Sequence, residues 1–250
     1  MHIVNASLSP AKATLLPPTQ SGYLLLAAEI DRRPMFLPSS APKRRLIAEL
    51  KQAAIEVESQ ANVVHATVFD GFAHLVFGEN HPLLRRGVAA GRLQRARYDL
   101  VVLVETTSPS AAQSLRASTA YSRLAARVQA AAHRTYAVAA SSPRTMGDVE
   151  VTRPGVFLFN FFYAQDDREL LPVWEYTAGW WMVNTGLDNS RVMAPLEGER
   201  RDYGITNFCR WDHLRDVAPQ MILRSSFRRF VLANFAANGI SAQPSLYRAA

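Results

Sequence analysis

Residues 156–164, VFLFNFFYA, place the strongest constraint on how this chain folds. The run is short, apolar and aromatic, which is typical of a β-strand. Successive side chains of a strand point to opposite faces of the sheet, so an apolar run is buried on both faces. One face carries Val156, Leu158, Asn160, Phe162 and Ala164, and the other carries Phe157, Phe159, Phe161 and Tyr163. The sheet that contains this strand therefore needs a cover on each side.

Strand and helix patterns recur twice in the same order. In the first half we expect strands over 22–30, 62–70, 98–106 and 135–140, with helices over 43–60 and 109–133. In the second half we expect strands over 156–164, 190–197, 203–211 and 240–248, with helices over 168–185 and 212–238. Each half therefore follows the order β-α-β-β-α-β, although residue identity between the halves is slight.

Several breaker residues refine these boundaries. A break near 118–119 divides the helix of residues 109–133, and Pro219 predicts a kink or break in the last helical stretch. Gly186 is a plausible helix stop. Pro195 suggests that its strand lies at a sheet edge. Residues 71–97 show no regular pattern.

The order β-α-β-β-α-β is that of the ferredoxin-like unit, whose helices cover one face of its sheet. Two such units in one chain resemble a tandem member of the dimeric α/β-barrel superfamily. That group includes small monooxygenases, haem-degrading monooxygenases, EthD-like proteins and chlorite-dismutase-like haem proteins. The resemblance implies an α+β fold in which two sheets pack face to face as a barrel. It divides the chain into an arm (1–21), a first unit (22–141), a linker (142–154) and a second unit (155–250).

Two asparagines are the most informative polar residues on the expected strands. The first and third strands of a ferredoxin-like unit are neighbours, so Asn160 and Asn207 are expected to meet. A buried amide needs hydrogen-bond partners. The two amides either satisfy each other and nearby backbone, or they anchor a ligand in an apolar pocket. Some cofactor-independent monooxygenases of the superfamily place an asparagine on their first strand, which Asn160 resembles.

Aromatic residues near these asparagines are candidates for the wall of a pocket. Alternation along residues 203–211 places Tyr203 and Trp211 on the face of Asn207, and Phe162 shares the face of Asn160. Trp174 and Trp181 lie nearly on one helix face, whereas Trp180 is turned about 100° away and is our candidate for a pocket wall or a subunit interface. Core packing is the competing explanation for all of them. His65, on an expected strand, is a further catalytic candidate, although a lone histidine there is more often structural.

Composition excludes several classes of function. The net charge is +7, but the arginines occur as scattered pairs and no nucleic-acid-binding motif accompanies them, so no nucleic-acid partner is expected. No apolar run approaches the length of about 18 residues that a membrane span needs. The N-terminus lacks the pattern of a secretory signal. The single cysteine excludes an internal disulfide, and we expect a cytoplasmic protein, with a homo-oligomer left open.

The histidines and Cys209 do not form a recognisable metal or nucleophile motif. No metal site is expected. In chlorite-dismutase-like haem proteins the iron ligand is a histidine on the first helix of the second unit, and residues 167–186 contain none. The resemblance therefore does not extend to a haem held in that way. No bound cofactor is predicted, and haem binding through His65 or His213 is the alternative left open.

Two functions follow from these observations. The first is an enzyme that acts on a small aromatic or apolar molecule in a barrel pocket, of the cofactor-independent monooxygenase type, with Asn160, Asn207 and His65 as catalytic candidates. The second is a non-catalytic protein that binds a small ligand or takes part in an assembly. The aromatic strand and Asn160 favour the first, and the absence of a polar catalytic constellation favours the second.

Overall fold

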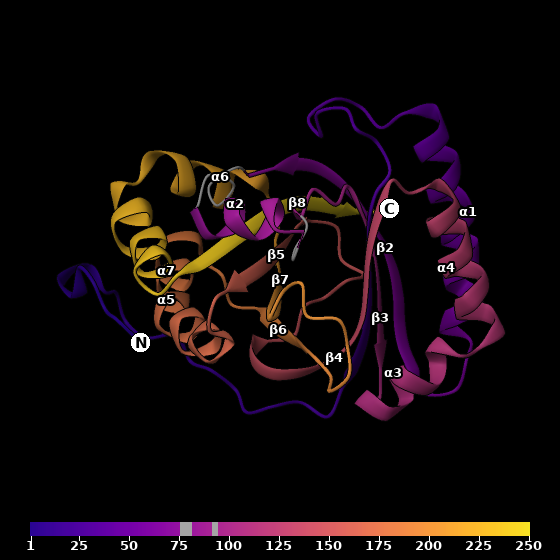
Figure 1. Cartoon of the computed structure of the whole chain (residues 1–250), viewed down its shortest axis with the longest axis horizontal. Coiled ribbons are helices and arrows are strands. Elements are labelled where there is room, and N and C mark those ends of the chain that lie inside the picture. The colour runs from indigo at the N-terminus through magenta and orange to yellow at the C-terminus, as the bar shows by residue number, and fades with distance from the viewer. Residues whose placement is uncertain (76–81, 92–94) are drawn as a thin grey trace.

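The strands of the chain form one closed antiparallel barrel in an α+β fold (Figure 1). The computed structural model describes residues 1–75, 82–91 and 95–250. The order around the barrel is β1-β3-β2-β8-β5-β7-β6-β4, and β4 returns to β1. The strands are β1 (Gly22–Glu29), β2 (Val63–His74), β3 (Leu100–Thr106), β4 (Arg134–Gly147), β5 (Val156–Ala164), β6 (Ser190–Pro195), β7 (Ile205–Trp211) and β8 (Ile240–Ala249).

Each half of the chain supplies four adjacent strands of this barrel. The first half contributes β4-β1-β3-β2 and the second half contributes β8-β5-β7-β6. The pairs β2–β8 and β4–β6 join the halves. Because the barrel is closed, none of its strands keeps a free edge, and the edge position suggested by Pro195 is wrong. Pro195 ends β6 and lies beyond the residues that pair with β7, so its missing N–H leaves that pairing intact.

Helices cover the barrel from two opposite sides (Figure 1). The helices α1, α3 and α4 lie beside the first half, and α5, α6 and α7 lie beside the second. The helices are α1 (Ala41–Glu58), α2 (Pro82–Ala89), α3 (Pro109–Arg116), α4 (Thr119–Ala131), α5 (Leu170–Thr185), α6 (Leu214–Leu223) and α7 (Ala233–Ala237), with 3-10 turns η1 (Ala6–Leu8) and η3 (Asp167–Glu169) and a π-helical turn η4 (Phe227–Leu232).

Most helix boundaries agree with the sequence-based expectation. The break between α3 and α4 is confirmed, since Ser118 caps the second helix by accepting a hydrogen bond from the Tyr121 N–H. Gly186 ends α5 in the left-handed conformation, with φ of 68°. Pro219 lies inside α6, so a break at this proline is wrong: the helix ends at Leu223, and Arg224 after it has an extended backbone.

Two strands run further than the local pattern indicated. β4 continues through Gly147 because its later residues pair with β6, so it enters the segment expected to be a linker. β2 continues to His74 because it pairs with β8. Within 71–97, expected to be irregular, residues 82–89 form α2; positions 76–81 and 92–94 lie outside the described residues.

The interior of the barrel is filled by aromatic side chains from both halves. Phe69 of β2 packs edge-on against Phe157 and Phe159 of β5, with ring centroids 5.0 and 5.1 Å apart. Phe159 stacks on Phe208 of β7 at 4.7 Å. Offset and edge-to-face arrangements are the favourable geometries for such rings. The face of β5 that carries Phe157 and Phe159 is therefore covered by the opposite half, as its apolar pattern required.

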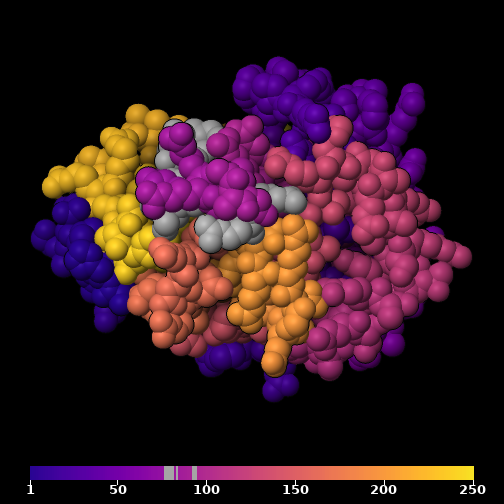
Figure 2. Space-filling view, viewed as in Figure 1, coloured from indigo at the N-terminus to yellow at the C-terminus, as the bar shows by residue number. Residues whose placement is uncertain are grey.

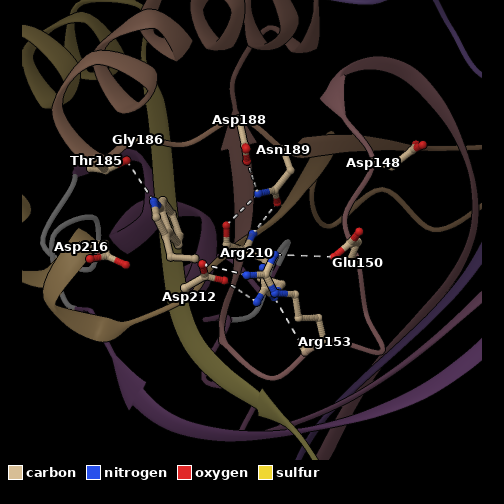
Figure 3. Close-up of a pocket in the computed structure, with 11 residues that line it drawn as sticks. Asp148, Glu150, Arg153, Thr185, Gly186, Asp188, Asn189, Arg210, Asp212 and Asp216 are labelled. Atoms are coloured by element: carbon tan, nitrogen blue, oxygen red, sulfur yellow. Dashed lines mark hydrogen bonds and ion pairs between the residues drawn. The ribbon is translucent and has the colours of Figure 1, made fainter.

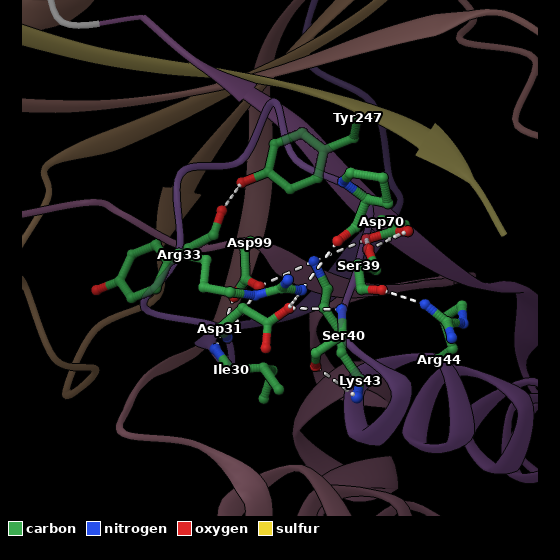
Figure 4. Close-up of polar contacts among 12 residues, drawn as sticks. Ile30, Asp31, Arg33, Ser39, Ser40, Lys43, Arg44, Asp70, Asp99 and Tyr247 are labelled. Atoms are coloured by element: carbon green, nitrogen blue, oxygen red, sulfur yellow. Dashed lines mark hydrogen bonds and ion pairs between the residues drawn. The ribbon is translucent and has the colours of Figure 1, made fainter.

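A buried ion cluster fixes the loop between β1 and α1 (Figure 4). The Lys43 ammonium lies 2.7 Å from an Asp70 oxygen and 2.8 Å from an Asp99 oxygen. Asp99 also accepts hydrogen bonds from the backbone N–H groups of Ile30 and Asp31. Because Lys43 and Asp99 are each only 2% exposed, their charges depend on these partners.

Among the described residues, no helix combines the length and the apolar character needed to cross a bilayer.

Candidate functional site

A small cavity lies between the strands of the second half and the helices α5 and α7. It encloses about 30 Å³, which is room for a single water-sized molecule. We call it the asparagine pocket, because two asparagines are its central polar residues. Its lining residues are Met146, Leu158, Asn160, Phe162, Trp174, Thr177, Ala178, Trp181, Leu187, Ser190, Asn207, Cys209, Trp211 and Phe235.

The two asparagines of this pocket face each other across neighbouring strands. Asn160 of β5 pairs with Asn207 of β7, which confirms that they meet. Both are 7% exposed. The Asn207 carbonyl oxygen accepts a hydrogen bond of 2.7 Å from the Ser190 hydroxyl, and its amide nitrogen lies 3.9 Å from the Cys209 sulfur.

Asn160 differs from Asn207 in one respect that matters for binding. Its side-chain oxygen Oδ1 is buried and has no hydrogen-bond partner. A buried polar atom without a partner costs about 1–3 kcal/mol, so such atoms are uncommon in folded proteins. Asn160 therefore offers an unused hydrogen-bond acceptor in an otherwise apolar pocket.

The aromatic wall of the pocket is held in place by hydrogen bonds and packing. The Trp211 indole N–H donates to the Thr185 hydroxyl at 3.0 Å. The Trp181 ring packs against that of Trp211, with centroids 6.1 Å apart. Phe162 packs edge-on against Phe235 of α7 at 5.4 Å. These rings come from two strands and two helices, so the pocket depends on the packing of the whole layer.

The structure brings some of the predicted lining residues together and separates others. Phe162 and Trp211 line the asparagine pocket. Trp180 does not: it is 1% exposed, donates its indole N–H to Ser226 and packs against Phe227. Tyr203 lies in the barrel interior, where its hydroxyl is 3.2 Å from that of Tyr98.

His65 lies in a different part of the molecule from the asparagines. It borders a cavity of about 10 Å³ together with Tyr23, Glu105 and Arg191. The Arg191 guanidinium contacts Glu105 at 2.7 Å and Asp148 at 2.7 Å. Burial raises the pKa of the Tyr23 hydroxyl well above its usual value. His65 and Asn160 therefore line different cavities in this structure.

A polar cleft of about 330 Å³ adjoins the asparagine pocket, and Trp211 borders both (Figure 3). Its centre is Arg210, which is 6% exposed and donates to the backbone carbonyls of Arg153 and Pro154 and to Asp212. The hydrogen bond from Arg210 lowers the pKa of the Asp212 carboxyl. Sequence reasoning missed this cleft, although a charged residue inside an apolar strand was a usable signal.

The pocket does not fit a haem, the group carried by one branch of the resembling superfamily. Haem iron is held by histidine, cysteine thiolate, methionine or tyrosine. The lining has no histidine or tyrosine, and burial raises the pKa of the Cys209 thiol, which keeps it protonated. Met146 is the one other ligand type present. Among the described residues, no group of three or more His, Cys, Asp or Glu side chains is arranged to hold a metal ion.

All lining residues of the asparagine pocket are neutral. The lining can therefore offer apolar and aromatic contacts and one or two hydrogen bonds to a bound molecule. It supplies no ionised acid or base for proton transfer. Any chemistry in this pocket relies on the reactivity of the bound molecule itself.

Comparison with solved structures identifies proteins of the same fold. A protein described as anthrone oxidase-like has a TM-score of 0.61 and 11% identity, covering 95% of this chain and 94% of its own. A candidate monooxygenase from Fusobacterium nucleatum has a TM-score of 0.57 and 6% identity, covering 92% and 93%. A candidate chlorite dismutase has a TM-score of 0.54 and 10% identity, covering 93% and 95%.

The chain shares its overall fold, which contains a closed antiparallel barrel, with these neighbours. Identities this low show a shared fold and do not transfer an activity. No protein-family model and no curated protein matches the sequence.

Proposed function

We propose that the asparagine pocket is the active site of an enzyme that oxidises a small aromatic or apolar molecule without a tightly bound cofactor. The observation that carries this proposal is the partnerless Oδ1 of Asn160 inside an aromatic-walled pocket. An isolated buried acceptor destabilises the protein, and a ligand that donates to it removes the penalty. The names of two neighbours, monooxygenase and anthrone oxidase-like, support this reaction class.

Five residues of the pocket have defined roles in this proposal. Asn160 accepts a hydrogen bond from a hydroxyl of the substrate and fixes its orientation. Asn207, held by Ser190, presents its amide N–H groups beside the same position. The rings of Trp174 and Trp211 cover the faces of the substrate and exclude water. The substrate itself supplies the electrons that reduce molecular oxygen, so the pocket needs no redox group of its own.

The pocket must enlarge before it can hold such a substrate. Small-molecule sites usually enclose about 300–1,000 Å³, and this one encloses about 30 Å³. Trp181 is partly exposed and borders the pocket, so movement of its ring or of α5 opens the space. We therefore expect substrate binding to be accompanied by a change in tryptophan fluorescence.

Anthrone, whose enol tautomer carries the hydroxyl that would donate to Asn160, is the first substrate to test, because one neighbour is described as anthrone oxidase-like. Anthrone and one molecule of oxygen give anthraquinone and one molecule of water, so no further reductant is consumed. We expect oxygen uptake above the uncatalysed rate and loss of at least tenfold of that activity in Asn160→Leu. Asn184→Leu, on α5 outside the pocket lining, is the matched control and should keep the wild-type rate. Equal rates in both variants would refute the role of Asn160.

A non-catalytic binding protein is the second candidate function. The observation that favours it is the neutral lining, which lacks an ionised acid or base. A carrier of this kind would bind 1-naphthol in an Asn160-dependent manner while leaving anthrone unoxidised. Binding without oxygen uptake across a panel of phenolic and quinol-type compounds would establish this alternative.

We also propose that the barrel consists of two ferredoxin-like units, residues 22–141 and 155–250. The strand orders β4-β1-β3-β2 and β8-β5-β7-β6 support it, because they are the same when the strands of each half are counted from its start. The candidate site then belongs mainly to the second unit. Met146 is the lining residue contributed by the segment between the units.

A further inference from the structure

The N-terminal arm, residues 1–20, lies against the same helices that roof the asparagine pocket. In Figure 2 the indigo N-terminal residues lie directly against the yellow C-terminal region. The arm then continues to the barrel, where the Leu16 N–H donates to the Thr145 carbonyl at 2.8 Å and the Thr19 N–H donates to Ser142 at 3.2 Å. It is thus attached at both ends of its path over the second half.

Two asparagine side chains hold the backbone of the arm. The Val4 N–H donates to Asn234 at 3.0 Å, and the Asn234 amide donates back to the Val4 carbonyl at 3.1 Å. Asn238 makes the same pair of bonds with His2, at 2.6 and 2.7 Å. Residues four apart on a helix rise about 6 Å, and residues two apart in an extended chain span about 6.6 Å. The asparagine spacing therefore matches alternate residues of an extended peptide.

Gly179 of α5 shows how closely the arm approaches the roof of the pocket. A Cβ atom at this position would overlap the Ala11 carbonyl oxygen. Glycine costs about 1 kcal/mol relative to alanine in the interior of a helix, so its presence here reflects the contact with the arm. Leu8 and Leu15 of the arm also pack against the core cluster that contains Trp174 and Phe235.

The arm and the pocket share two helices. α5 supplies Ala178 and Trp181 to the pocket lining and Gly179 to the arm contact. α7 supplies Phe235 to the lining and Asn234, its neighbour in sequence, to the arm. The arm therefore ties together the two helices whose separation would enlarge the pocket.

We infer that the N-terminal arm is a strap that holds α5 and α7 together over the asparagine pocket, and that its release admits the substrate. The need to admit a substrate rests on the proposed function, whereas the strap itself is a separate physical claim. The arm is mostly exposed and is held by a small number of hydrogen bonds, so its release costs less than unfolding of the barrel.

Gly179→Ala in the full chain tests the strap directly. The new methyl group displaces Ala11, whereas alanine strengthens the isolated helix. Hydrogen exchange should quicken at least tenfold at the Val4 and Leu16 amides, and it should quicken at the amides of α5 as well. Val183→Ala is the matched control, because it also raises helix propensity but stands 55% exposed on the same helix. It should leave both sets of amides unchanged.

The possible outcomes test the strap and the proposed function independently of each other. If the arm amides exchange faster while the α5 amides do not, the strap is overturned, whatever the pocket binds. If the α5 amides exchange faster, the strap stands, and 1-naphthol then serves as the probe of the pocket. Its association rate should rise at least fivefold in Gly179→Ala. Absence of 1-naphthol binding to every variant would count against the pocket as an aromatic site and leave the exchange result intact.

Asn238→Ala provides a second route if Gly179→Ala does not fold. It removes both hydrogen bonds to His2 and the hydrogen bond to the Asn234 carbonyl, while leaving the side-chain contacts of Asn234 with Val4 in place. We expect the same pattern of exchange with a smaller amplitude, about threefold at Val4. Unchanged exchange throughout the arm would show that the asparagines do not hold it.

Discussion

The two halves of the barrel use the same strand order but fill the space between sheet and helices differently. In the first half this layer is aliphatic apart from Tyr121, and Leu26 of β1 pairs with Val102 of β3. In the second half Asn160 pairs with Asn207 at the corresponding place. All four tryptophans of the chain lie in the second half. The first layer is a packed core, whereas the second contains a pocket with polar residues.

Two buried polar groups, one from each half, also differ in how they are satisfied. In the first half, Lys43 and Asp99 are fully buried and partner each other. In the second half, Asn160 is buried with one atom unpartnered. A satisfied cluster specifies and rigidifies a fold, and an unsatisfied atom at a pocket is where a ligand gains energy. Tyr136 Oη and Arg95 Nε of the first half are also buried without a partner, so the contrast concerns two places: the Lys43 cluster serves the structure, and the asparagine pocket serves recognition.

Removal of the Lys43 charge should have the largest effect on stability. Lys43→Met leaves the buried carboxylate of Asp99 without its cation, which typically costs about 3–5 kcal/mol. We expect the free energy of unfolding, measured with guanidinium chloride, to fall by about 4 kcal/mol. Lys51→Met, at an exposed position of the same helix, should change it by less than about 0.5 kcal/mol. A small effect of Lys43→Met would remove the distinction between the halves.

Introducing an asparagine into the layer between sheet and helices of the first half tests the comparison between the two halves directly. Leu26→Asn buries an amide in an aliphatic layer and also removes packing volume, so we expect a loss of about 3 kcal/mol. Thermal and chemical unfolding measure it. Leu26→Met keeps the volume and should cost less than about 1.5 kcal/mol. Tolerance of asparagine at this position would mean that the first half holds a pocket of its own.

Asn160→Leu should change the stability of the protein in the opposite direction. It removes an unsatisfied acceptor from an apolar surrounding, so we expect stability to rise by about 1 kcal/mol while binding of 1-naphthol is lost. Asn207→Leu should instead lower stability by about 1 kcal/mol, because it leaves the Ser190 hydroxyl without its acceptor. Equal signs for the two substitutions would show that the asparagines are equivalent and that Asn160 is not the ligand anchor.

The sequence predicted the asparagine pair because alternation along a strand is a local property. Phe162 and Trp211 followed from the same alternation and line the pocket. Tyr203 did not, because it precedes β7 and the intervening Gly204 pairs its N–H with the Phe162 carbonyl, which interrupts the alternation. Local pattern thus identified the strand residues of the site.

The positions of residues that depend on long-range packing could not be predicted from local alternation. Helix periodicity separated Trp180 from Trp181 but could not say which of them faces the sheet, since that depends on how α5 docks. The extension of β4 to Gly147 depends on pairing with β6 in the other half. The polar cleft around Arg210 joins segments far apart in the chain, such as Glu150 and Asp188. The fold class was predictable, whereas the geometry of the site depended on tertiary contacts.

The last effect we predict concerns pH and Tyr121 in the helical layer of the first half. Burial raises the pKa of Tyr121 to about 12, from 10.0 when exposed. The unfolded chain therefore releases this proton at lower pH than the folded protein does. The stability contributed by the neutral hydroxyl is complete below pH 10 and is lost as the pH rises from 10 to 12.

Tyr121→Phe removes this dependence from the first half alone. Tyr98, in the barrel interior, has its pKa raised by burial to about 12 and continues to titrate, so the alkaline transition persists. We expect the difference in unfolding free energy between pH 9 and pH 11 to be smaller in Tyr121→Phe than in the wild type. Chemical denaturation at both values measures it, with phenolate absorbance recorded in parallel. An unchanged difference would show that the first helical layer opens before its tyrosine ionises, and its description as a packed core would fail.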